Sequence, residues 1–171
     1  VFYFALLTSV VGGIILYCFS DFIALYLGAS ETLLPLVQEY TEIIYLGAFI
    51  IVLHPMLDIF AINDKQRLLA MIAMIVGAAM NIVLNYLFLF VLELGIHSSA
   101  LATVLGHGIG MCILLQHFLR KKGNLYLIKA FDLYAILMAT KNGIPQSSSE
   151  ISVSVMMLIF NHTIAGIAGD R

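Results

Sequence analysis

The sequence has few charged residues, only two cysteines and no tryptophan, and each scarcity excludes a class of protein. Charged residues make up 11% of the 171 residues, whereas about one quarter of a soluble domain is charged. Cys18 and Cys112 both fall inside apolar segments, so they indicate neither a disulfide framework nor a metal site. Without tryptophan, an aromatic belt at a membrane interface must rely on tyrosine.

Motifs of enzymes and of nucleic-acid-binding proteins are also missing. The sequence contains no His-Glu-x-x-His, no Gly-x-Ser-x-Gly and no phosphate-binding loop. Its basic clusters flank apolar segments and lack the interleaved aromatics of a nucleic-acid surface. We therefore expect a protein that is not an enzyme, with no catalytic residue, no metal, no cofactor and no nucleic-acid partner.

Apolar residues are what the sequence has in excess. They make up 62% of the chain, and the mean hydropathy is +1.05. This composition predicts an all-α, polytopic transmembrane bundle, a multi-pass protein of the inner (cytoplasmic) membrane in contact with the lipid bilayer. The predicted spans are residues 1–27, 43–61, 68–92, 97–119 and 144–168, with a kink or break at Pro55 in the second.

Basic residues are distributed unevenly between the connections, which predicts the orientation of the spans. Seven of the eight Lys and Arg residues lie in segments 62–67 and 120–141, whereas segments 28–42 and 93–96 carry Glu and no base. By the positive-inside rule the basic connections are cytoplasmic, and the first span runs outward. Segment 120–142 is interpreted as a basic linker with an amphipathic helix on the membrane surface.

Polar residues inside the third and fourth predicted spans are the first candidate site. Asn81 and Asn85 are one helical turn apart and share a face of the third span. Thr103 lies on a stripe of small residues in the fourth span. Two interpretations remain open: these side chains hydrogen-bond neighbouring helices, or they line a cavity that holds a cation, a proton-bearing water or a substrate.

Other polar residues within the predicted spans allow two interpretations each. Glu150 is a carboxylate inside the fifth span, where charge is usually functional, or it is hydrated near the cytoplasmic interface. Asn161 lies about three turns deeper. His107 shares the face of Thr103 as a packing residue or a proton relay, and Asp58, one turn after His54, is placed near the interface or in a functional role.

The order and spacing of these residues resemble the MATE family, the multidrug and toxic compound extrusion transporters. The resemblance rests on the segment Asn81-Ile82-Val83-Leu84-Asn85-Tyr86, followed by Gly95-Ile96 and Ala100-Leu101-Ala102-Thr103, with Glu150-Ile151-Ser152 and Phe160-Asn161 downstream. It implies that the chain is helices three to seven of a twelve-helix protein. Residues 1–119 would then be four helices of the N-terminal lobe and residues 143–171 the first helix of the C-terminal lobe, so that the remainder of its own chain is required.

The resemblance also implies a function. Members of the family export amphipathic or cationic drugs and other small-molecule, drug-like substrates by alternating access, as antiporters driven by inward Na⁺ or H⁺. Asn81, Asn85 and Thr103 match positions of a first-lobe cation or proton site, and Glu150 and Asn161 are the candidates from the second lobe. Asn85 departs from the common Asp and cannot bind a proton. A lipid-linked oligosaccharide flippase and a non-transporting membrane scaffold remain the alternatives.

Overall fold

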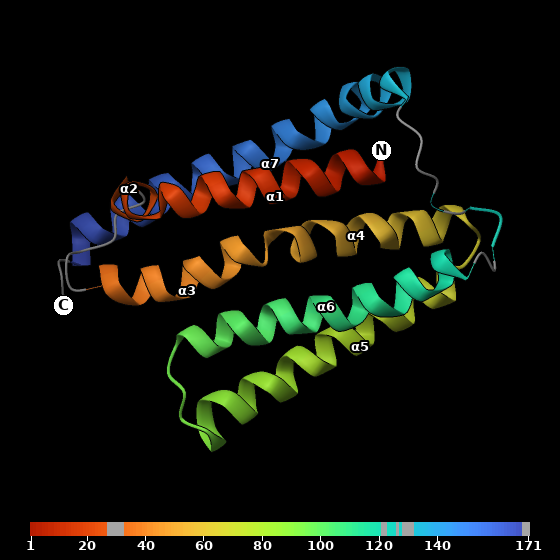
Figure 1. Cartoon of the computed structure of the whole chain (residues 1–171). Coiled ribbons are helices and arrows are strands. Elements are labelled where there is room, and N and C mark those ends of the chain that lie inside the picture. Colours follow the sequence, from red (N-terminus) through yellow and green to blue (C-terminus); the bar gives the residue numbers. More distant parts are fainter. Residues whose placement is uncertain (27–32, 121–122, 126, 128–131, 169–171) are drawn as a thin grey trace.

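The computed structural model describes residues 1–26, 33–120, 123–125, 127 and 132–168, with residues 165–168 described by their backbone only. Helices account for all the regular structure among these residues. Figure 1 shows the longer helices running roughly along one common axis, with the short α2 turned away from it. In chain order the elements are α1 (Phe2–Cys18), α2 (Ser20–Tyr26), α3 (Leu34–Leu46), α4 (Ala48–Asn63), α5 (Arg67–Tyr86), the π-helical turn η1 (Leu87–Val91), α6 (His97–Leu119) and α7 (Leu133–Ala168).

The first two predicted spans are each a bent pair of helices. α1 and α2 meet at 72°, and α3 and α4 meet at 51°. The second bend lies at Gly47, whereas Pro55, where the sequence predicted a kink, lies inside α4 without breaking it. Gly47 is in such close contact with Val104 of α6 that an added Cβ would overlap the valine methyls. Packing on α6, a tertiary contact, therefore places the bend.

The third and fourth predicted spans are confirmed. Arg67–Val91 and His97–Leu119 are long and apolar enough to cross a membrane, and each bent pair meets the same test when taken as one span. α5 packs more extensively on α6 than any other two helices do. A Cβ added to Gly106 would lie 2.8 Å from the carbonyl oxygen of Gly77, so this pair of glycines sets how closely the two helices approach.

The fifth predicted span differs from the structure in its start. α7 is one helix of 36 residues that passes through Pro145, with no break between a surface helix and a span beginning at Ile144. The Ser148 hydroxyl donates to the Pro145 carbonyl at 2.7 Å, so the polar start of the span is helical too. The described part of α7 is not among the helices that meet the spanning criterion. Residues 121–122, 126 and 128–131 of the predicted linker, and 169–171, lie outside the described residues.

Large apolar side chains cover the outside of the bundle, and the buried core is small. Ile82 is 69% exposed and Phe90 72% exposed, and most of α7 exposes apolar side chains. The core joins α4, α5 and α6 near one end of the bundle. Its members are Leu57, Ala61, Ala70, Ala73, Leu114 and Phe118. Apolar surface on this scale is stable in lipid and not in water.

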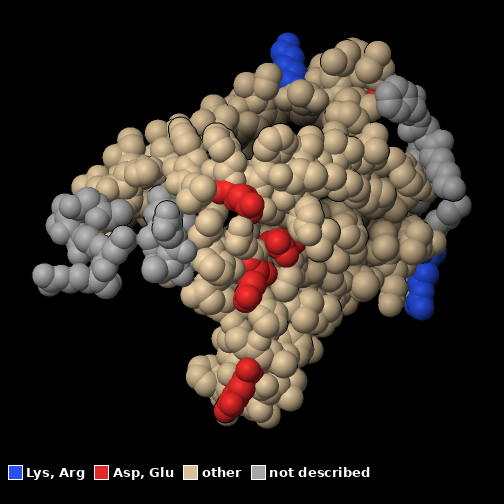
Figure 2. Space-filling view, turned by 60° about the vertical axis from the view of Figure 1, so that its left-hand side comes forward, with Lys and Arg blue, Asp and Glu red and all other residues tan. Residues whose placement is uncertain are grey.

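One end of the described bundle carries acidic residues and no Lys or Arg, whereas the opposite end carries Lys and Arg together with Asp64. The acidic residues Asp21, Glu39, Glu42 and Glu93 belong to α2, α3 and the α5–α6 loop. Figure 2 shows acidic side chains from the middle of the view down to its lower end, with Lys and Arg at the top and right edges. At the opposite end, Lys65 and Arg67 occupy the α4–α5 turn. A cytoplasmic location of the basic end stays a prediction of the positive-inside rule.

Two adjacent glycines of α1 provide a matched test of this packing. A Cβ at Gly13 would lie 2.5 Å from the carbonyl oxygen of Tyr45 on α3, whereas a Cβ at Gly12 would meet nothing within 4 Å. We expect Gly13→Ala to lower the free energy of unfolding of the full-length protein by about 1–3 kcal/mol. Gly12→Ala should leave it unchanged or raise it by up to about 1 kcal/mol. Equal melting temperatures of the two variants in detergent would contradict the α1–α3 contact.

Candidate functional site

A cavity of about 440 Å³ lies between α4, α5 and α6 and opens to the outside of the described bundle beside the exposed side chains of Met74 and Ile82. Its polar lining comes from all three helices. The side chains that matter for its chemistry are His54 of α4, Asn81 of α5, and Thr103 and His107 of α6. Gly77 and Gly106 also line it, so the glycine contact that brings α5 to α6 forms part of the wall.

Three of the site residues predicted from sequence lie together. Asn81 Nδ2 donates to Thr103 Oγ1 at 3.2 Å, which joins α5 to α6. Asn85 Nδ2 donates to the backbone carbonyl of Asn81 at 3.0 Å and approaches Asn81 Oδ1 at 3.3 Å. Asn81 and Thr103 line the cavity, and Asn85 is not among its lining residues. Both interpretations of these side chains, a bond between helices and a cavity lining, therefore have a geometric basis.

Glu150 and Asn161 lie on α7, away from this cavity. Both are exposed, and Glu150 Oε1 accepts a hydrogen bond of 2.9 Å from Gln146 Nε2 on the same helix. Near the far end of α7, His162 Nε2 lies 3.3 Å from the carbonyl oxygen of Tyr26 at the end of α2. The described residues thus do not bring Glu150 or Asn161 to Asn81 and Thr103, and their role in a second-lobe site stays a prediction.

The histidines are the part of the site that sequence reasoning left open, with His107 interpreted as a packing residue or a proton relay and His54 noted only for its spacing to Asp58. His54 Nδ1 lies 3.0 Å from His107 Nδ1, across the α4–α6 interface. On the far side of the His54 ring, Nε2 lies 3.7 Å from Asp58 Oδ2. The available signals were the one-turn spacing of His54 and Asp58 and the position of His107 on the Thr103 face. Neither signal reveals that the two helices cross at this point.

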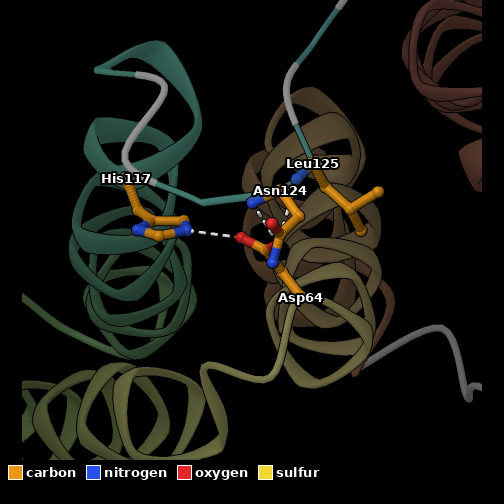
Figure 3. A network of polar contacts seen from close by, with 4 residues as sticks. All are labelled: Asp64, His117, Asn124 and Leu125. Carbon is orange, nitrogen blue, oxygen red and sulfur yellow. Dashed lines mark hydrogen bonds and ion pairs between the residues drawn. The ribbon is translucent and has the colours of Figure 1, made fainter.

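A second polar cluster lies at the basic end, where Asp64 ends α4 (Figure 3). Asp64 Oδ2 accepts a hydrogen bond of 2.8 Å from His117 Nε2 of α6. Asp64 Oδ1 accepts from the backbone N–H groups of Asn124 and Leu125 at 2.7 and 2.9 Å. The carboxylate is 2% exposed and ties the segment after α6 to the α4–α5 turn.

Electrostatics at Asp64 follow from these bonds. The hydrogen bond from His117 is the largest influence holding the pKa of Asp64 below its usual value of 3.8, with help from the Leu125 and Asn124 N–H groups and against the effect of burial. Gly123 completes the cluster, since a Cβ there would overlap the carboxylate. Sequence analysis did not select Asp64 or His117 as site residues, because the contact joins residues 53 positions apart.

Comparison with known proteins identifies the family. A family model described as MatE matches residues 1–87, slightly more than half of the chain. The chain belongs to the MatE family. It is a multi-pass protein of the cell membrane, in agreement with the spans of the bundle.

Among curated relatives, the multidrug export protein MepA of Staphylococcus saprophyticus is 25% identical over 147 residues. That match covers 84% of this chain and 33% of the relative. The MepA protein of Staphylococcus aureus (strain bovine RF122) is 28% identical over 102 residues, which is 60% of this chain and 23% of that protein. The chain therefore spans about a third or less of the length of these MatE relatives. Both relatives are named as export proteins and not as enzymes.

The fold is also found in a solved structure, described as "Crystal structure of MATE in the bent conformation". The match has a TM-score of 0.83 and covers 99% of this chain and 39% of that one, at 24% sequence identity. At that identity the likeness establishes the fold alone. It confirms the prediction of a partial MATE-like helical bundle.

Asp64 supplies a test that depends on pH. Its pKa is lower in the folded protein than in the unfolded chain, so its stabilising contribution is present above about pH 3.8 and is lost as the pH falls through the folded value. We expect Asp64→Asn to lower the melting temperature at pH 7, with the difference from wild type shrinking as the pH falls below 3.8.

Glu93→Gln, a change at an exposed carboxylate in the α5–α6 loop, is the matched control. It should leave the melting temperature unaltered at pH 7 and at pH 3. A constant difference between Asp64→Asn and wild type from pH 7 down to pH 3 would contradict the role given to the ionised carboxylate.

Proposed function

We propose that the full-length protein is a secondary active antiporter that exports amphipathic or cationic, drug-like molecules. An inward proton or sodium gradient drives it, and two lobes alternately expose a central cavity to either side of the membrane. Support comes from membership of the MatE family and from relatives named as multidrug export proteins. In this protein the described helices α1–α6 would supply most of one lobe.

The observation that carries this proposal is the cavity between α4, α5 and α6. Its volume of about 440 Å³ falls in the usual range for small-molecule sites, roughly 300–1,000 Å³. The wall is mainly apolar, with an amide at Asn81, a hydroxyl at Thr103 and imidazoles at His54 and His107. An amphipathic molecule fits such a surface, because the apolar wall buries its body while the few polar groups orient it.

The cavity favours a drug-like cargo over a lipid-linked oligosaccharide. A lipid-linked sugar carries a phosphate group, whose recognition usually requires Arg or Lys. No Lys or Arg is among the described residues that line the cavity. A purely structural scaffold is the remaining alternative. It predicts that the polar side chains make dry contacts between helices, whereas the described residues form a hollow there.

Within this mechanism, Asn81, Asn85 and Thr103 would present the polar face of one lobe to an ion or substrate. The Asn81 side-chain amide already donates one N–H to Thr103, and its oxygen lies 3.3 Å from the Asn85 amide nitrogen. A bound cation would compete for the Asn81 and Thr103 oxygens and would therefore act on the α5–α6 contact. If the cation binds these oxygens in one state of the lobes and not in the other, its binding would be coupled to that of the substrate.

The direct test is transport of a cationic dye by the full-length protein in proteoliposomes, with a proton gradient and a sodium gradient imposed separately. Dye movement driven by either gradient would establish ion-coupled export. Absence of movement under both, from protein that elutes as a single folded species, would overturn the proposal and make lipid-linked sugars the next substrates to assay.

One substitution tests the part played by the site. Thr103→Val keeps the side-chain shape but removes the oxygen that accepts the Asn81 N–H, leaving a half-buried amide without this partner. We expect the initial rate of gradient-driven dye transport to fall about tenfold, the factor that corresponds to about 1.4 kcal/mol. Thr8→Val is the matched control, since Thr8 is exposed on α1 and bonds only its own helix backbone. Equal rates in both variants would remove Thr103 from the site.

A further inference from the structure

Three ionisable side chains meet inside the bundle of a chain that has few charges. His54 of α4 lies between Asp58, one turn further along α4, and His107 of α6. His54 is 5% exposed, and both of its ring nitrogens face another ionisable group. Burial of such a cluster is unfavourable unless its charges compensate one another, so its retention in the membrane needs an explanation.

The contact between the histidines requires a shared proton. Two Nδ1 atoms at 3.0 Å form a hydrogen bond only when one carries hydrogen and the other presents its lone pair. In the arrangement that also serves Asp58, His107 donates its Nδ1–H to His54 Nδ1, and His54 carries its own proton on Nε2, facing Asp58 Oδ2 at 3.7 Å. The second nitrogen of His107 is then bare and can accept a proton.

The cluster is also incompletely bonded. His54 Nε2 and Asp58 Oδ1 are buried, and neither has a hydrogen-bond partner among the described residues. A buried polar atom without a partner is unfavourable, because it has lost its hydrogen bonds to water and gained none in the protein. A proton or water that enters the cluster would find these atoms available.

Charged groups on the neighbouring helices do not neutralise the cluster by direct contact. Arg67 of α5 lines the same hollow as Asp58, but no ion pair joins the two among the described residues. The carboxylates of α3, Glu39 and Glu42, belong to the acidic end, where Glu39 lies 3.8 Å from His97. α1 carries no Asp, Glu, Lys, Arg or His, and its titratable side chains, Tyr3, Tyr17 and Cys18, are exposed.

Two hollows reach the cluster, one lined by its histidines and the other by Asp58. The 440 Å³ cavity is lined by His54 and His107 together with Asn81 and Thr103. A second hollow of about 270 Å³ is lined by Asp58 and by Arg67, the first residue of α5 at the basic end. Met74 lines both, so the three ionisable groups lie where one hollow adjoins the other. Each hollow has room for water.

Glycines on α5 and α6 make room for the central imidazole. A Cβ added to Gly110 would overlap His54 Nε2, and a Cβ added to Gly77 would lie 3.6 Å from His54 Cε1. The small residues at these positions therefore do more than let two helices approach. They hold the His54 ring between α5 and α6, with one nitrogen toward each neighbouring group.

From this geometry we propose that Asp58, His54 and His107 form a proton relay, and that the ion coupled to export is a proton. A proton arriving from the cavity binds the bare nitrogen of His107, and the Nδ1–H of His107 moves to His54 Nδ1. His54 then passes its Nε2–H to Asp58, which releases it into the hollow beside Arg67. One proton enters and one leaves, with no change in net charge. The coupling role rests on the proposed antiport, whereas the proton site stands on geometry alone.

The proton site is tested without any transport assay. Full-length protein in ether lipids, which have no ester carbonyl, is titrated with acid while its infrared difference spectrum is recorded. We expect a protonated-carboxyl band that Asp58→Asn removes, and whose midpoint His107→Gln shifts by about one pH unit or more. His97→Gln, at a partly exposed histidine at the start of the same helix as His107, should leave the band in place. Identical carboxyl titrations in wild type and Asp58→Asn would overturn the relay.

The coupling role is tested in proteoliposomes with the same variants. We expect Asp58→Asn and His107→Gln to lose proton-driven dye efflux at least about tenfold. Dye exchange without a gradient should persist in Asp58→Asn, whose side chain is not among the residues that line the cavity, and elution as a single folded species is the check on His107→Gln. Efflux within twofold of wild type in either variant, or wild-type efflux driven by sodium and not by protons, would overturn the coupling role. Absence of all dye transport by wild type would instead refute the proposed antiport, and the infrared titration would still decide the proton site.

Discussion

The close contact of α5 with α6 is the constraint on which the rest of the site depends. Gly77 and Gly106 allow the backbones to approach until a single added carbon would be 2.8 Å from a carbonyl oxygen. Lipid gives no hydrophobic drive for helices to associate, so such packing must come from shape and from hydrogen bonds. The Asn81–Thr103 bond forms at this contact, and the cavity is lined by the same glycines.

Much of the fold could be predicted from the sequence because a span is specified locally. The apolar length of α5 and α6 needs no knowledge of neighbours, and their predicted limits agree closely with the structure. The bend at Gly47 could not be predicted in this way, since it depends on Val104, 57 residues along the chain. The continuity of α7 through Pro145 was missed because proline and a polar run normally indicate a helix boundary.

The candidate site likewise has one part that could be predicted from local sequence and another that depends on how the helices pack. Asn81 and Asn85 share a helix face by spacing alone, and the family resemblance added Thr103 from the next helix. The meeting of His54 with His107 depends on where α4 crosses α6, which no periodicity in either helix encodes. The sequence identifies polar residues in the predicted spans as candidates for the site. It could not rank them, because the role of each depends on whether its polar atoms remain unpaired after the helices pack.

Two acid–histidine contacts in this chain illustrate that distinction. Asp58 lies within α4, and Asp64 directly follows that helix. Asp58 lies near His54 of α4, and Asp64 lies near His117 of α6. Asp64 accepts three hydrogen bonds and has both oxygens in use, so protonating it can only weaken the structure. Asp58 accepts none among the described residues, and one of its oxygens is buried without a partner. A carboxylate that is fully bonded holds a turn in place, whereas one that is incompletely bonded beside a hollow can take up and release a proton, which is why the relay is assigned to Asp58 and the structural role to Asp64.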